Sequence, residues 1–166
     1  MELALLKESN PWWEDKNWAD KDFHLTNLNK QSIRWIYTII DDFSIGIYSL
    51  RGSRQVGKTC WIKQKIKYLL AKTALSNIFF YSCDNLNKDD LLEIINVFLE
   101  LSESGKKFIF LDEIPFVKDW ELAIKHLYDA GKLKDCFVLL CGSNSLDLKR
   151  SVERLPAGVM RVKGIL

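Results

Sequence analysis

The segment GSRQVGKT, from Gly52 to Thr59, has the residue types and spacing of a loop that binds the phosphates of a nucleotide. Its two glycines can adopt backbone angles that are closed to other residues, and they let the chain approach an anion closely. Successive backbone N–H groups and the start of the following helix then face the phosphates. The pattern therefore predicts that Lys58 bridges the β- and γ-phosphates and that the Thr59 hydroxyl ligates Mg²⁺.

The surroundings of this loop favour the same interpretation. An apolar run precedes it and an amphipathic stretch follows it, which is the strand-loop-helix context that phosphate binding requires. The alternative is a glycine turn that happens to precede a helix beginning with lysine. Three of the residues are not expected to read the nucleotide specifically: Arg54, Gln55 and Val56. The predicted nucleotide-binding residues are Gly52, Ser53, Arg54, Gln55, Val56, Gly57, Lys58, Thr59 and Cys60.

A second candidate element is FIFLDEI, in which four apolar residues end at Asp112 and Glu113. In parallel sheets, ligands bind at the carboxyl ends of the strands, so both carboxylates should reach that edge. We expect Asp112 to hold Mg²⁺ and Glu113 to polarise the attacking water as a general base. Successive strand residues point to opposite faces, which would give the two acids different roles. The alternative is that the acidic pair only caps the turn before Pro115.

A third element is FVLLCGSNS, where Ser143 and Asn144 follow an apolar run and a glycine. A polar side chain at this place could hold the nucleophilic water or report hydrolysis to the rest of the fold. The alternative is a turn whose residues serve only its backbone geometry. Of the two residues, Asn144 is preferred as a catalytic contact.

The elements that must position these residues alternate along the chain. Apolar runs predict buried strands at 45–50, 77–83, 107–112 and 136–141, and amphipathic patterns predict helices at 58–70, 88–101 and 120–128. Alternating strands and helices favour right-handed crossovers, so we predict a three-layer α/β fold with a mostly parallel sheet. Residues 44–166 form this predicted core. Residues 1–43 are predicted to form an irregular arm rich in tryptophan, with a helix around residues 30–40.

Composition excludes several classes of protein. The formal net charge of +2 is too small to indicate a nucleic acid or membrane partner by itself. Apolar runs are too short for a transmembrane helix, and the first residues lack the features of a secretory signal, so a cytoplasmic location is expected.

The four cysteines show no CxxC pairing and are expected to be free thiols. Lys63, Lys65, Lys67 and Lys72 are expected to form a solvated face, the alternative being contact with nucleic acid. The tryptophans are expected to pack in the core.

Taken together, the three elements resemble AAA-type P-loop ATPases of archaea and bacteria, whose ATPase core is often followed by a C-terminal domain. RGSRQVGKT resembles their Walker A segment, FIFLDEI their Walker B segment, and LLCGSNS their sensor-1 strand. The resemblance covers roughly residues 10–156 and implies the P-loop NTPase fold with ATP and Mg²⁺ as cofactors. It implies that Gly57, Lys58, Thr59 and Asp112 bind them and that Glu113 is catalytic.

The last residues depart from this resemblance. Family members usually continue a Leu-Pro step with Gly-Arg, whereas here Leu155 and Pro156 run into AGVM. A messenger RNA that encodes a Gly-Arg ending would give this tail if it lost one nucleotide and its reading frame shifted. This suggests a truncated core without the lid domain. An isolated core of this kind would lack a trans-acting arginine finger, which contributes about 10³- to 10⁵-fold in rate where it operates. We therefore expect slow hydrolysis by the isolated chain.

Two other functions remain open at this point. One is a non-catalytic, nucleotide-dependent interaction module that acts on DNA or a protein partner. The other is a small-molecule kinase, which would need an acceptor pocket and a lid. The sequence also leaves open a homo-oligomer.

Overall fold

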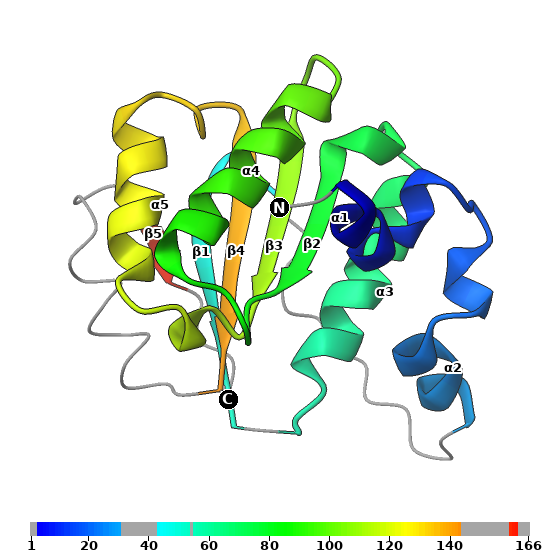
Figure 1. Ribbon diagram of the computed structural model, residues 1–166. Helices are drawn as coiled ribbons and strands as arrows, with labels where there is room; N and C mark the ends of the chain where they lie inside the picture. Colours follow the sequence, from blue (N-terminus) through cyan, green and yellow to red (C-terminus); the bar gives the residue numbers. More distant parts are fainter. Residues whose placement is uncertain (1–2, 31–42, 54, 144–159, 163–166) are drawn as a thin grey trace.

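The computed structural model describes residues 3–30, 43–53, 55–143 and 160–162. Its centre is a five-stranded sheet in the order β2-β3-β4-β1-β5, and all the described strand pairs are parallel (Figure 1). The strands are β1 (Gly46–Arg51), β2 (Ile78–Ser82), β3 (Lys107–Asp112), β4 (Cys136–Gly142) and β5 (Met160–Val162). The predicted α/β fold with a parallel sheet is therefore confirmed, and each of the four predicted strands is present within one residue at either end.

Three helices connect strands β1 to β4: α3 (Lys58–Leu70), α4 (Lys88–Leu101) and α5 (Trp120–Asp129). Each begins at the residue that the sequence pattern predicts. At the start of α4, the Asn87 side chain accepts hydrogen bonds from the backbone N–H groups of Asp89 and Asp90, and the Asp90 carboxylate accepts one from the Asn87 backbone. This reciprocal cap satisfies donors that the first turn of a helix leaves unpaired, so the local sequence sets the helix start.

The sheet is covered on both faces, as the three-layer prediction requires. Within one strand, alternate residues enter different core clusters: Ile109 and Leu111 of β3 join the cluster that contains α4 and α5, while Phe108 and Phe110 join the cluster that contains α3. The continuous apolar runs arise because both faces of each central strand are buried. Figure 1 shows α4 and α5 crossing the near face of the sheet.

The N-terminal arm is more regular than the sequence pattern indicated. Over residues 3–30 it contains two α-helices and two 3₁₀ turns: α1 (Leu3–Ser9), η1 (Pro11–Trp13), η2 (Trp18–Asp20) and α2 (Phe23–Lys30). Hydrophobic periodicity does not reveal these elements, because they are short, rich in polar side chains and interrupted by Pro11. Their stability comes from contacts with the core. The helix expected around residues 30–40 falls almost wholly outside the described residues.

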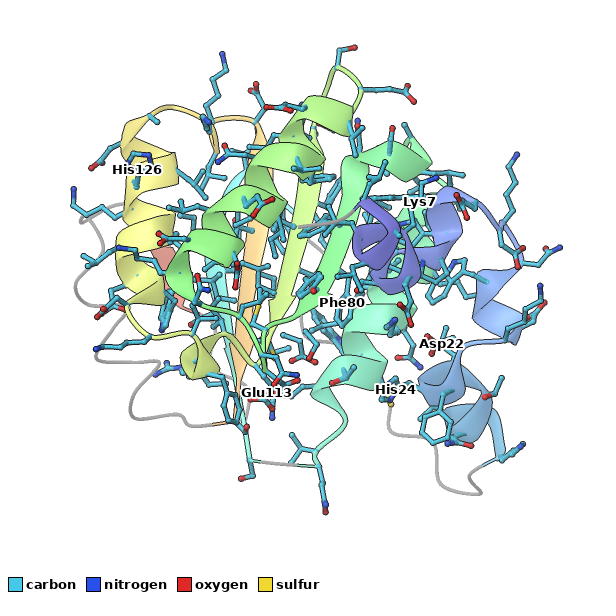
Figure 2. The ribbon with its side chains drawn as sticks, viewed as in Figure 1. Lys7, Asp22, His24, Phe80, Glu113 and His126 are labelled. Carbon is cyan, nitrogen blue, oxygen red and sulfur yellow. The ribbon has the colours of Figure 1, made fainter. Side chains whose placement is uncertain are left out.

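The arm closes the open edge of the sheet at β2. The Asn10 side chain accepts a hydrogen bond from the Phe80 N–H at 2.7 Å and donates one to the Phe80 carbonyl at 3.1 Å, so it pairs with β2 as a neighbouring strand would. The indole N–H groups of Trp12 and Trp13 both donate to the Ile78 carbonyl. The position of Phe80 beside the arm can be followed in Figure 2. These bonds satisfy backbone groups that an edge strand otherwise leaves exposed.

One lysine of α3 contradicts the expected solvated face. Lys67 and Lys72 are exposed, but Lys63 is buried and its ammonium lies 3.2 Å from a carboxylate oxygen of Asp22. The same ammonium lies over the rings of Trp12, Trp18 and Phe80. The prediction was wrong for Lys63 because the docked arm covers this part of the helix, a tertiary contact without a local sequence signature. The predicted core positions of Trp12, Trp18, Trp61 and Trp120 are confirmed.

Two further expectations concern thiols and membranes. The four cysteines are free, with Cys83, Cys136 and Cys141 buried and Cys60 half-buried. Within the described ranges, no helix is both long and apolar enough to cross a bilayer.

Candidate functional site

The phosphate loop joins the carboxyl end of β1 to the first turn of α3. Gly57 immediately precedes the helix with φ of 83°, a left-handed conformation that glycine adopts without steric cost. Gln55 also has a positive φ, of 62°, although it carries a Cβ atom. Such strain persists only where the surrounding structure enforces it, and it is common at ligand sites. Arg54 lies outside the described residues.

Lys58 folds its side chain back over this loop. Its ammonium donates hydrogen bonds to the carbonyl oxygens of Gly52 and Ser53, at 3.0 and 2.8 Å. The side chain is nearly buried, so the loop holds a positive charge at the mouth of α3, where the helix dipole also attracts anions. An anion bound there would meet both the ammonium and the first backbone N–H groups of the helix.

Thr59 brings α3 to the acidic end of β3. Its hydroxyl Oγ1 donates a 2.5 Å hydrogen bond to Oδ2 of Asp112, across 53 residues of sequence. Asp112 is buried, with 3% of its surface exposed. A hydroxyl and a carboxylate in contact are oxygen donors of the kind that Mg²⁺ prefers, so the residues present fit that ion.

Asp112 and Glu113 point in different directions because the backbone turns sharply between them. Glu113 has φ of 51°, in the left-handed region, and its N–H donates to Oδ1 of Asp112 at 3.1 Å. The Glu113 carboxylate meets Ser143, which follows β4: the Ser143 hydroxyl lies 2.8 and 2.7 Å from the two carboxylate oxygens, and its N–H donates at 3.2 Å. Ser143 therefore fixes the orientation of Glu113.

The two candidate residues after β4 thus differ in what the structure describes. Sequence reasoning preferred Asn144 as the catalytic contact, and that residue lies outside the described residues. Ser143, the residue set aside, is the one that contacts Glu113. The sequence signal for it was its position directly after a strand, which is also where the other polar residues of the site occur.

The strand order explains how these groups meet. β4 lies between β1 and β3, so the phosphate loop and the acidic pair end on strands that are not neighbours. Two side chains connect the phosphate loop and β4 to the acidic pair: Thr59, at the start of α3, contacts Asp112, and Ser143, after the intervening strand β4, contacts Glu113. This is the point where the chain changes direction across the sheet, the usual place for a ligand in an open parallel sheet.

Two thiols lie close to the site. Burial, followed by the negative charge of Asp112, raises the pKa of Cys141 well above its usual value, and its thiol hydrogen-bonds the Asp112 carboxylate. Burial, followed by the charge of Asp22, raises the pKa of Cys60. Both side chains are therefore neutral at physiological pH and poor nucleophiles.

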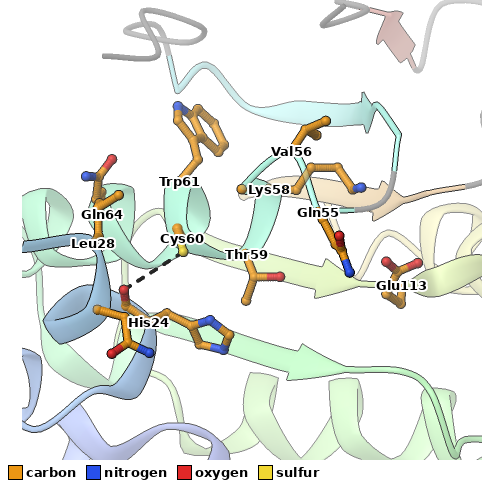
Figure 3. A pocket seen from close by; sticks show the side chains of 12 residues that line it. His24, Leu28, Gln55, Val56, Lys58, Thr59, Cys60, Trp61, Gln64 and Glu113 are labelled. Carbon is orange, nitrogen blue, oxygen red and sulfur yellow. Dashed lines mark hydrogen bonds between the residues drawn. The ribbon is translucent and has the colours of Figure 1, made fainter. Parts of the chain in front are cut away.

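A pocket of about 730 Å³ opens between the phosphate loop and the arm (Figure 3). Its lining includes the predicted binding residues Gln55, Val56, Gly57, Lys58, Thr59 and Cys60, together with the predicted catalytic residue Glu113. It is also lined by residues that sequence reasoning missed: His24, Asn27, Leu28, Trp61 and Gln64. The first three lie on one face of α2, at the i, i+3, i+4 spacing of a helix, which is the signal that could have found them.

Comparison with curated proteins gives a similar relative. The uncharacterized protein MJ1637 of Methanocaldococcus jannaschii is 28% identical over 143 aligned residues, which cover 78% of this chain and 30% of that protein. This chain therefore spans less than a third of the length of that relative.

Among solved structures, a DNA polymerase III gamma subunit-related protein of Thermotoga maritima is similar, with a TM-score of 0.52. It is 11% identical, and the match covers 74% of this chain and 42% of that one. At such low identity the likeness shows the fold alone.

The AAA domain family matches residues 44–165, well over half of the chain and all of the sheet described above. Since the matched range contains the phosphate loop, the acidic end of β3 and Ser143, the chain belongs to the AAA domain family of nucleotide-binding P-loop ATPases.

Proposed function

We propose that this protein binds ATP as its Mg²⁺ complex and hydrolyses the terminal phosphate. The observation that carries the proposal is the contact between Thr59 Oγ1 and Asp112 Oδ2 at the mouth of the phosphate loop. It joins a loop suited to phosphate and an acid suited to a divalent cation, which are the two parts that phosphoryl transfer needs in one place.

In this proposal the loop residues bind the triphosphate. The Lys58 ammonium exchanges its bonds to the Gly52 and Ser53 carbonyls for bonds to phosphate oxygens, which are stronger because both partners are charged. Backbone N–H groups from Gln55 to Thr59 complete the cradle at the start of α3.

Thr59 and Asp112 would hold Mg²⁺, through the hydroxyl oxygen and the carboxylate. The ion would neutralise charge on the β- and γ-phosphate oxygens. The burial of Asp112 fixes its carboxylate, so that it need not be ordered when the nucleotide binds.

Glu113 is the proposed general base. It lines the same pocket as Thr59, and the Ser143 hydroxyl contacts both of its carboxylate oxygens. A base in this position accepts a proton from the attacking water, a role that contributes about 10²- to 10⁴-fold in rate.

The test is to measure Mg-ATP binding by calorimetry and phosphate release under single-turnover conditions. Lys58→Ala should abolish detectable binding, whereas Lys67→Ala, an exposed lysine on the same helix, should bind as the unchanged protein does. Glu113→Gln should retain binding within about threefold and lose at least about 100-fold in hydrolysis.

Unchanged hydrolysis in Glu113→Gln would reject the catalytic role. Binding without hydrolysis by the unchanged protein would favour a nucleotide-dependent interaction module acting on DNA or a protein.

The slow turnover expected from the sequence stays a prediction, which brisk single-turnover kinetics would contradict. Assembly into a homo-oligomer also stays a prediction, and light scattering with and without Mg-ATP tests it.

A further inference from the structure

One wall of the nucleotide pocket comes from α2 of the arm. This helix precedes the range matched by the AAA domain family, residues 44–165, and supplies His24, Asn27 and Leu28. Its residues face the phosphate loop across the pocket in Figure 3. The site is therefore a composite of the family core and a segment outside it.

The position of α2 is fixed by bonds at its first turn. One carboxylate oxygen of Asp22 accepts the backbone N–H groups of His24 and Leu25, both at 3.0 Å. The other oxygen lies 3.2 Å from the Lys63 ammonium of α3, with both side chains 10% exposed. Because Asp22 joins the start of α2 to α3, the backbone of His24 is held in a fixed position beside the pocket.

His24 is also tied to α3 through its carbonyl oxygen, which lies 3.9 Å from the Cys60 sulfur. Its ring meets the Phe23 ring edge-on, with centroids 5.7 Å apart. The backbone on both sides of His24 is thus anchored, and its side chain packs against a neighbouring ring. A side chain ordered in this way can contact a ligand with little further loss of entropy.

The His24 ring lies at one particular end of the pocket. In Figure 3 the imidazole projects into the pocket on the side where Thr59 and Glu113 lie. Thr59 contacts the metal-binding acid, and Glu113 is placed for the attacking water. In the proposed function, groups on this side of the loop would face the terminal phosphate.

We propose that His24 binds the γ-phosphate of the bound nucleotide through a ring N–H group, so that the arm distinguishes the triphosphate from the diphosphate. This proposal rests on the proposed function. The contact would couple hydrolysis to the arm, because loss of the γ-phosphate removes the ligand of a residue on α2.

The test compares ATP and ADP, each with Mg²⁺, in binding to His24→Ala by calorimetry. The variant should bind ATP about tenfold more weakly, the loss of one hydrogen bond to a charged group, and ADP within twofold of the unchanged protein. The control is His126→Ala, which removes the other histidine of the chain, an exposed residue of α5 (Figure 2). It should change neither affinity.

A second measurement follows His24 in the unchanged protein and so does not depend on the stability of His24→Ala. The chain has two histidines, and the spectrum of His126→Ala assigns their ring proton signals. The His24 signal should move on addition of a non-hydrolysable Mg-ATP analogue and stay nearly in place with Mg-ADP.

Equal losses of ATP and ADP affinity in His24→Ala, or no loss of either, would overturn the proposal, as would a His24 signal that moves equally with both nucleotides. The Lys58→Ala variant distinguishes a failure of the His24 proposal from a failure of the proposed function. If that variant keeps full affinity for both nucleotides, the proposed function itself is wrong and the role of His24 falls with it.

Discussion

The Ser143 hydroxyl lies within 2.8 Å of both carboxylate oxygens of Glu113, although the two residues are 30 positions apart and follow different strands. Glu113 adopts a left-handed backbone conformation to make this contact. A residue with a Cβ atom seldom takes that conformation, and such outliers concentrate at functional sites. The geometry makes Ser143 a positioning residue for the proposed general base.

Ser143→Ala should therefore lower the single-turnover hydrolysis rate about tenfold or more, because a misplaced catalytic group loses rate steeply. The affinity for Mg-ATP should stay within twofold, since Ser143 is not among the residues that line the pocket. Ser143→Thr should recover most of the rate, and Ser104→Ala, an exposed serine, should leave it unchanged. A matched fall in affinity and rate would contradict the positioning role.

The buried pair of Lys63 and Asp22 should be needed to dock the arm. Lys63→Met leaves the Asp22 carboxylate buried without its partner and should destabilise the fold by about 3 kcal/mol in urea unfolding. Adding Asp22→Asn removes the orphaned charge while retaining an oxygen to cap α2.

The double variant Lys63→Met with Asp22→Asn should accordingly be more stable than Lys63→Met alone. If the second substitution lowers stability further by its full separate effect, the two side chains do not interact as inferred.

Asn10 should contribute to stability through the edge of the sheet. Asn10→Ala leaves the Phe80 N–H and carbonyl without partners in a buried place and should cost about 2 kcal/mol or more of unfolding free energy. Hydrogen exchange at the Phe80 amide should speed up at the same time. The exposed Asn17→Ala serves as the control. An unchanged exchange rate at Phe80 in Asn10→Ala would show that Asn10 does not protect this edge.

Stability should fall in alkaline solution because of the buried thiols. Burial raises the pKa of Cys136 from about 9 to about 11, so the folded state favours the neutral thiol. A raised folded-state pKa contributes stability that is complete below about pH 9 and is lost as the pH rises towards 11.

Cys136→Ala should therefore show a shallower loss of unfolding free energy than the unchanged protein over that pH interval, whatever its stability at neutral pH. If the unfolding free energies of the two proteins, measured by denaturant titration, fall equally steeply between pH 8 and 11, ionisation of the Cys136 thiol is not the cause of the loss.

Much of the site could be recognised from the sequence because its parts are local. The phosphate loop needs glycines, a lysine and a threonine at fixed spacing, and all lie within Gly52 to Thr59. The starts of α3 and α4 follow from patterns that span a few residues, as does the end of β3 at Asp112. Such signals are complete within one stretch of chain, since capping, turn formation and periodic burial act over one or two turns.

Other features depended on segments that meet only in the folded chain. The sequence does not reveal that β4 lies between β1 and β3, and so could not favour Ser143 as the partner of Glu113. Nor does it reveal that the arm covers Lys63 and carries His24 to the pocket. Local sequence therefore determined the phosphate loop and the acidic strand end, whereas tertiary packing decided which distant side chains join them. Burial and charge pairing between remote segments depend on the three-dimensional path of the chain, and no short pattern encodes that path.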